Sequence, residues 1–235
     1  MFNRRFLDSV RHRLINVMSP SLQSRNSKPK GAEDGFTIFV DYQNFYFHLK
    51  TVYEVNAQQV NLSELFESLA RANGFQISEV LLFTGVPDAE RDPRGSGKIQ
   101  RRLAFFRHTG IQVFTAPMVY VNDHKESRTR AMERGVDLML ASELIKKVNA
   151  GVSKIMIVSN DKAFAQSVRI AADVAMGNGK VLEALSVIPL GFDPESLRMR
   201  GIGAEGIDFT TRIGLSQDLV NEHVAERFRS EDALA

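Results

Sequence analysis

The chain has 235 residues, 43% of them hydrophobic and 25% charged, which fits one globular domain with additional terminal segments. Cysteine is absent, so disulfide scaffolds, thiolate zinc sites and cysteine nucleophiles are excluded, and a metal ion would need oxygen or histidine ligands. The formal net charge is only +2, so a nucleic-acid partner would need clustered basic residues, and the lack of a long apolar run predicts no transmembrane helix.

Residues 1–35 differ in composition from the rest of the chain. Arginine outnumbers the lone Asp8 before Pro20, and apolar side chains recur every four residues from Phe2 to Met18, which predicts a basic amphipathic helix followed by a flexible linker. This helix suits packing against the domain, a protein partner or a second copy of the chain. It also suits binding to an anionic membrane or RNA, or organellar targeting. Without a secretory segment, we expect a cytoplasmic location, with organellar targeting left open.

From Phe36 onwards, short apolar runs alternate with segments of helical periodicity. The expected strands are 37–40, 80–84, 111–116, 154–159 and 182–190. The expected helices are 43–53, 62–73, 96–109, 136–149, 163–176 and 216–228. This alternation predicts an α/β fold, a three-layer Rossmann-like sandwich with a mainly parallel central sheet and the strand order 3-2-1-4-5. We expect the main domain to span 36–190 and a C-terminal extension with a helix to span 191–235.

Three aspartates are expected at one edge of this sheet. Asp41 directly follows the first strand, Asp161 follows the fourth, and Asp137 lies in the first turn of the helix before the fourth strand. In the order 3-2-1-4-5 the first and fourth strands are neighbours at the switch point, where binding sites form. Glu143 lies about two turns further along the helix of Asp137.

Two explanations compete for these aspartates. Any one of them can cap the helix that follows it. Three together favour a metal site, because clustered carboxylates repel each other and a hard cation such as Mg²⁺ or Mn²⁺ neutralises them. Such an ion can polarise a phosphoryl oxygen and activate a water molecule, which is the chemistry of phosphodiester hydrolysis.

Two basic segments flank the expected carboxylate site. One runs from Arg94 to Arg107 and contains no acid, and the other is the expected loop 125–134. The candidate RNA-binding residues are Arg94, Lys98, Arg101, Lys125, Arg128, Arg130 and Arg134. Phosphates would be attracted to this basic rim, although the first segment also fits the solvated face of a helix. Tyr42, Tyr46 and Tyr120 are candidates for stacking on bases.

The sequence contains, in order within residues 36–190, the blocks FVDYQNFY, ERGVDLMLASELI and IVSNDKAFAQSVRIA. Together they resemble the NYN domain family, the PIN-like nucleases that include the bacterial LabA-like proteins. The resemblance implies a PIN-like fold and a metal-dependent ribonuclease. Residue by residue, the family's site corresponds to Asp41 and Asn44 in the first block, Asp137 and Glu143 in the second, and Asp161 in the third.

The third block departs from the family pattern. Ala163 stands where the family has a second acid, and Asn160 replaces a glycine. Two hypotheses therefore remain open. In the first, the protein is a metal-dependent endoribonuclease whose Asp41, Asp137 and Asp161 hold Mg²⁺ or Mn²⁺, with Glu143 nearby and Asn44 positioning the site. In the second, it is a catalytically weak or inactive module that binds RNA or recruits a partner.

Overall fold

The computed structural model describes residues 35–123, 128–192 and 207–224. The amphipathic helix and linker expected within 1–35 lie outside these residues, except for Gly35. Within the described ranges, no helix has the length and apolar character needed to cross a membrane.

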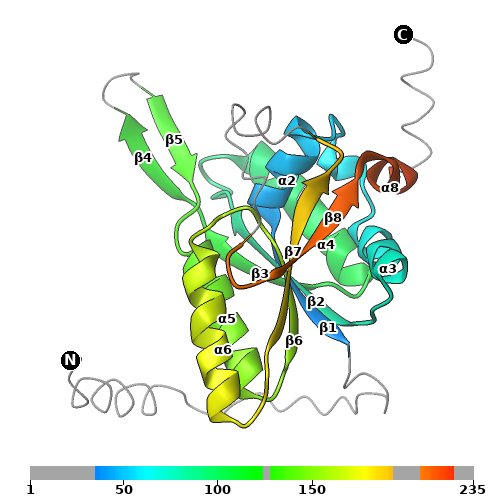
Figure 1. The fold of residues 1–235 in the computed structure, drawn as a ribbon. Coiled ribbons are helices and arrows are strands. Elements are labelled where there is room, and N and C mark those ends of the chain that lie inside the picture. The colour runs from blue at the N-terminus through cyan, green and yellow to red at the C-terminus, as the bar shows by residue number, and fades with distance from the viewer. Residues whose placement is uncertain (1–34, 124–127, 193–206, 225–235) are drawn as a thin grey trace, which may run out of the picture. The chain divides into compact units, whose positions relative to one another are not determined.

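A parallel sheet forms the centre of the fold (Figure 1). Its strands are β1 (Phe36–Asp41), β2 (Ile77–Val86), β3 (Gln112–Pro117), β6 (Lys154–Val158), β7 (Glu183–Leu190) and β8 (Thr211–Ser216). They lie in the order β3-β2-β1-β6-β7-β8, and every neighbouring pair is parallel. The expected order of the five apolar strands is therefore confirmed, with β8 added beside the fifth.

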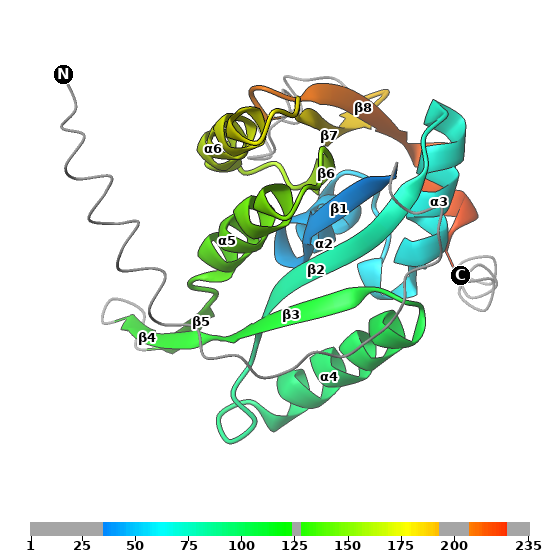
Figure 2. The same cartoon turned by 90° about the horizontal axis from the view of Figure 1, so that it is seen from below.

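Helices cover both faces of this sheet. They are α2 (Tyr42–Thr51), α3 (Leu62–Asn73), α4 (Pro93–His108), α5 (Val136–Asn149), α6 (Phe164–Gly177) and α8 (Gln217–Glu222). One apolar cluster packs α2, α3, α4 and α8 against the sheet, and a second packs α5 and α6 against the opposite face. Figure 2 shows α5 and α6 on one side of β1 and β2 and α4 on the other. The predicted three-layer α/β fold is confirmed.

Strand β1 lies in the interior of the sheet, between β2 and β6, and all six of its residues are buried. Its side chains alternate between the two cores, with Ile38 and Val40 in one and Phe39 in the other. β1 pairs with β2 and with β6, so Asp41 lies opposite Phe83 and Val40 opposite Val158. Parallel pairing on both sides brings the carboxyl ends of these strands to the same edge.

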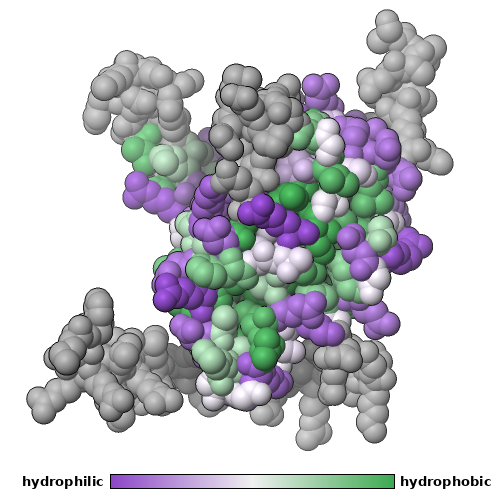
Figure 3. Space-filling model, viewed as in Figure 1, coloured by the Kyte–Doolittle hydropathy of each residue, from purple (hydrophilic) through white to green (hydrophobic). Residues whose placement is uncertain are grey.

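The expectation of a loop over 125–134 is wrong in part. Residues Arg128–Met132 form β5, which pairs antiparallel with β4 (Val119–Asp123). This hairpin extends away from the main sheet (Figure 1). Val119, Val121 and Met132 are exposed on it, and green apolar surface is visible on the hairpin in Figure 3. The strands of the hairpin, VYVND and RTRAM, mix polar and apolar residues, so the sequence gives no clear strand pattern there.

Strand β8 was also missed. In Thr211–Ser216 only Ile213 and Leu215 are buried, as befits a strand at the sheet edge, so the apolar pattern is weak. The helix expected at 216–228 corresponds to α8, which ends at Glu222. Residues 225–228 lie outside the described part of the chain. The segment expected as a C-terminal extension therefore contributes a strand to the main sheet.

Candidate functional site

Asp41 lies at the junction of β1 and α2 and is 5% exposed. Its Oδ1 accepts a hydrogen bond from the backbone N–H of Asn44 at 3.3 Å, which caps α2. Its Oδ2 accepts a hydrogen bond from the Ser159 hydroxyl at 3.0 Å. The capping explanation is therefore correct for Asp41, and the same carboxylate is also joined to the residue that follows β6.

A second set of hydrogen bonds fixes the chain after β6. The backbone N–H of Asp161 donates to the Ser159 hydroxyl at 3.1 Å, and that of Asn160 donates to Asn44 Oδ1 at 2.9 Å. Asn44 therefore binds the backbone of the neighbouring segment. The Asn160 amide also contacts the imidazole of His48, which is buried, and burial lowers the pKa of His48 to about 4. At neutral pH this histidine is uncharged.

Asp161 stabilises the turn that precedes α6. Its Oδ1 accepts a hydrogen bond from the backbone N–H of Ala163 at 2.8 Å. Residue 163 carries no acidic side chain, but its backbone still provides a hydrogen-bond donor to one oxygen of Asp161.

The carboxyl groups at this edge influence one another's protonation. Burial raises the pKa of Asp41 to about 6, hydrogen bonds from Asn44 and Ser159 oppose that rise, and the charges of Asp137 and Glu133 add to it. Burial also raises the pKa of Asp137, and the charge of Asp161 raises it further. We call Asp41, Glu133, Asp137 and Asp161 the carboxylate cluster. The structure thus brings the three predicted aspartates into one electrostatic neighbourhood.

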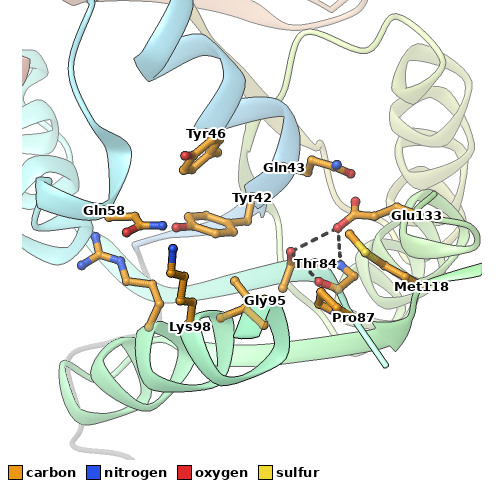
Figure 4. Close-up of a pocket in the computed structure, with 13 residues that line it drawn as sticks. Tyr42, Gln43, Tyr46, Gln58, Thr84, Pro87, Gly95, Lys98, Met118 and Glu133 are labelled. Atoms are coloured by element: carbon orange, nitrogen blue, oxygen red, sulfur yellow. Dashed lines mark hydrogen bonds between the residues drawn. The ribbon is translucent and has the colours of Figure 1, made fainter. Parts of the chain in front are cut away.

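Glu133 was not singled out by the sequence. Its Oε1 accepts hydrogen bonds from the backbone N–H of Gly85 and, at 3.2 Å, from the hydroxyl of Thr84 (Figure 4). Burial raises its pKa, and the charge of Asp137 contributes. A Cβ atom at Gly85 would lie 2.5 Å from Glu133 Cγ, so the glycine makes room for this side chain. The available sequence signal was its position four residues before Asp137 in ERGVD.

The oxygen donors of the carboxylate cluster suit a hard cation such as Mg²⁺ or Mn²⁺. Among the described residues, however, no three acidic or histidine side chains are arranged as a ready set of metal ligands. Protein donors engage both oxygens of Asp41 and one oxygen of Asp161. The chemistry of the donors therefore fits a metal ion, while the side chains adopt a hydrogen-bonded arrangement.

Glu143 takes part in a different contact. Its carboxylate pairs with Lys146 Nζ at 3.1 Å on the same helix, and the side chain is only 14% exposed. Lys146 lies about one turn after Glu143 in α5, whereas Asp137 lies in the first turn of that helix. Within the described part of the chain, Glu143 has no contact with the carboxylate cluster.

The predicted basic residues are distributed over several elements. Arg94, Lys98 and Arg101 are exposed on α4, and Arg134 is exposed just before α5. Arg128 and Arg130 belong to β5, but their side chains lie outside the described atoms, as does the whole of Lys125. Among the predicted basic residues whose side chains are described, Lys98 lines a pocket beside the carboxylate cluster.

This pocket has a volume of about 260 Å³ and lies between α2 and α4 (Figure 4). Tyr42 and Tyr46 of α2 line it together with Lys98 and Arg102 of α4 and with Glu133. Arg102 is held by a hydrogen bond to the carbonyl of Val60 and by packing over the Phe106 ring at 4.6 Å. Because Glu133 belongs to both, the pocket and the carboxylate cluster adjoin.

Comparison with known proteins gives one family match. A model of the NYN domain family matches residues 36–184. No curated protein matches the chain significantly. Among solved structures, the crystal structure of a protein of unknown function from Vibrio parahaemolyticus is similar to this one with a TM-score of 0.47 and 16% identity, over 80% of this chain and 96% of that chain. The matched range 36–184 includes every residue of the carboxylate cluster.

Proposed function

Because the chain belongs to the NYN domain family, a family of PIN-like nuclease domains, we propose that it is a metal-dependent endoribonuclease that hydrolyses RNA phosphodiester bonds. The observation that carries this proposal is the carboxylate cluster. Burial raises the pKa values of Asp41, Glu133 and Asp137, and the neighbouring carboxylates raise them further. Groups whose charged forms are disfavoured in this way are typical of functional sites.

A divalent cation would relieve this repulsion. Asp41, Asp137 and Asp161 are the residues that would hold Mg²⁺ or Mn²⁺, because they provide the oxygen ligands that these ions prefer. When bound, the ion would polarise a phosphoryl oxygen and lower the pKa of a bound water molecule, so that this water loses a proton more easily and can act as the nucleophile.

Other residues orient the cluster. The Ser159 hydroxyl and the backbone N–H of Asn44 donate to the two oxygens of Asp41 and favour its ionised form. Asn44 Oδ1 accepts a hydrogen bond from the backbone N–H of Asn160. This bond fixes the backbone directly before Asp161. Arg94, Lys98 and Arg101 of α4 are exposed, and so is Arg134 before α5. These four cations would attract the phosphates of an RNA strand towards this edge.

The test is cleavage of end-labelled RNA by the full chain in Mn²⁺, in Mg²⁺ and in EDTA. We expect cleavage with either ion, loss of cleavage in EDTA, and products with 5′-phosphate and 3′-hydroxyl ends. Asp41→Asn should remove cleavage without unfolding the protein, whereas Asp173→Asn, which changes an exposed acid on α6, should retain it. Cleavage that persists in EDTA, or in Asp41→Asn at the wild-type rate, would refute the proposal.

A second candidate function is RNA binding without efficient cleavage. The observation that favours it is Ala163 at the position of the family's second acid, together with the lack of a ready ligand set among the described residues. The same assay separates the two functions, because the second predicts retention of labelled RNA without fragments in either metal. A role of the N-terminal segment in assembly stays a prediction, since that segment lies outside the described residues.

A further inference from the structure

The pocket between α2 and α4 is smaller than a typical site for a drug-sized ligand. Its volume is about 260 Å³, whereas such sites usually span roughly 300–1,000 Å³. The space therefore suits one planar group with a short attachment. Its position is defined by Tyr42, which directly follows Asp41, and by Glu133, which belongs to the carboxylate cluster.

One wall of the pocket is aromatic. The Tyr42 ring is buried and packs edge-on against Phe106, with ring centroids 5.3 Å apart. The Tyr46 ring lies 6.2 Å from that of Tyr42 at an angle of 65° and is only partly buried. Figure 4 shows the two rings on the same side of the pocket. A fixed ring beside a more accessible one gives a planar aromatic ligand a surface to stack on.

The opposite wall is cationic. Lys98 is exposed on α4, and Figure 4 shows its ammonium group directed towards the Tyr42 ring. Arg102 lies further along the same helix, where its charge acts on the Tyr42 hydroxyl. An aromatic wall facing a lysine fits a ligand that joins a flat base to an anionic phosphate.

We propose that this pocket binds a single nucleotide unit of an RNA strand, with its base against Tyr46 and its phosphate at Lys98. The inference rests on the proposed function for the identification of the ligand as RNA. It adds a base-holding site that would position the strand beside the carboxylate cluster. Stacking accepts any base, so the pocket would hold the strand without reading its sequence.

The experiment uses the small number of tyrosines in the chain. The sequence has 4 tyrosines and no tryptophan, so full-length protein labelled with 3-fluorotyrosine gives a simple ¹⁹F spectrum that Tyr→Phe variants can assign. The protein is titrated in EDTA with 5′-AMP, ribose 5-phosphate and inorganic phosphate. We expect 5′-AMP to shift the signals of Tyr42 and Tyr46 and to leave that of Tyr53, a buried core residue, in place. The Tyr53 signal also reports that each variant is folded.

Two variants with the same change of charge locate the phosphate. Lys98→Gln should weaken 5′-AMP binding several-fold, whereas Arg107→Gln, which removes an exposed charge from the same helix, should leave it unchanged. Tyr46→Ala should remove the response of Tyr42 to 5′-AMP. Equal responses to 5′-AMP and inorganic phosphate, or no response of either pocket tyrosine to 5′-AMP, would overturn the inference.

This result is independent of the cleavage assay. Binding of 5′-AMP by a protein that does not cleave RNA would support the pocket and refute the proposed catalysis. Cleavage by a protein whose pocket tyrosines ignore 5′-AMP would support the catalysis and overturn the pocket.

Discussion

Asn44 Oδ1 accepts a hydrogen bond of 2.9 Å from the backbone N–H of Asn160, a residue 116 positions away in the sequence. This bond joins the start of α2 to the segment that follows β6. The same two segments are joined again by the hydrogen bond between Ser159 and Asp41. The edge of the sheet between β1 and β6 is therefore held by a short polar network that also orients two of the aspartates.

Replacing Asn44 tests this network. Asn44→Ala should lower the free energy of unfolding by about 1–3 kcal/mol, because it leaves the partly buried N–H of Asn160 without its acceptor. It should also reduce RNA cleavage by displacing Asp161. Asn44→Asp keeps an acceptor at this position and is the matched control for stability. Urea denaturation and the cleavage assay measure both effects, and an Asn44→Ala variant as stable and active as the wild type would contradict the prediction.

The pKa of Asp41 predicts how stability depends on pH. Burial raises this pKa to about 6 in the folded chain, from the ordinary aspartate value of 3.8. Between these pH values the unfolded chain has lost the proton that the folded chain keeps, so the free energy of unfolding falls as pH rises. The loss is complete above pH 6 and amounts to roughly 3 kcal/mol at most, for about two pKa units.

Asp41→Asn removes this titration. In metal-free buffer the variant should therefore be more stable than the wild type at about pH 7, and the difference should shrink towards pH 4. Urea denaturation in EDTA at several pH values measures the difference. A constant difference across this range would show that Asp41 titrates normally.

Metal binding should reverse the repulsion in the carboxylate cluster. Mn²⁺ at about a hundred times its dissociation constant should stabilise the wild type by about 2.7 kcal/mol, by mass action. Asp137→Asn should reduce this gain, because it removes both a ligand and the charge that acts on Asp41. Asp173→Asn is the matched control on the surface. Thermal denaturation with Mn²⁺ and with EDTA gives the measurement, and equal gains in the two variants would argue against metal binding by the cluster.

Gly85 tests the placement of Glu133. Gly85→Ala would put a Cβ 2.5 Å from Glu133 Cγ and should cost about 1–3 kcal/mol of stability through overpacking. Glu133→Ala should relieve the clash, so the effects of the two substitutions should not add in a double-mutant cycle. Gly97→Ala on α4 meets only the end of the Arg101 side chain, at 3.7 Å, and should be neutral or slightly stabilising. Additive effects of the first pair would contradict the contact.

Position 163 tests the departure from the family pattern. Ala163→Asp places an acid beside Asp161 and should increase Mn²⁺-dependent RNA cleavage if the missing acid limits catalysis. The backbone N–H of residue 163 donates to Asp161 Oδ1 whatever its side chain, so we expect the fold to be retained. Ala163→Asn is the matched control of similar size without the charge. An increase with both variants, or with neither, would show that the missing acid does not limit the rate.

Much of the fold could be predicted from the sequence, because buried strands and amphipathic helices leave periodic patterns. The helices at 62–73 and 136–149 have the predicted bounds, and the order of the five apolar strands is correct. The hairpin β4–β5 was missed because its apolar residues Val119, Val121 and Met132 are exposed. Strand β8 was missed because only two of its residues are buried. The periodic signal reports burial, so elements that bury few residues escape it.

For the site, the edge of the sheet that the aspartates occupy could be predicted, since each aspartate follows a strand or opens a helix at a known point in the topology. The partners of these aspartates depend on the tertiary structure. It placed Glu133 beside Gly85, paired Glu143 with Lys146, and tied Asp41 to Ser159. Position along a strand or helix is encoded locally. Contacts between side chains distant in sequence depend on the space that the packed elements leave and on the rotamers that fit it. Local sequence patterns do not specify either of these.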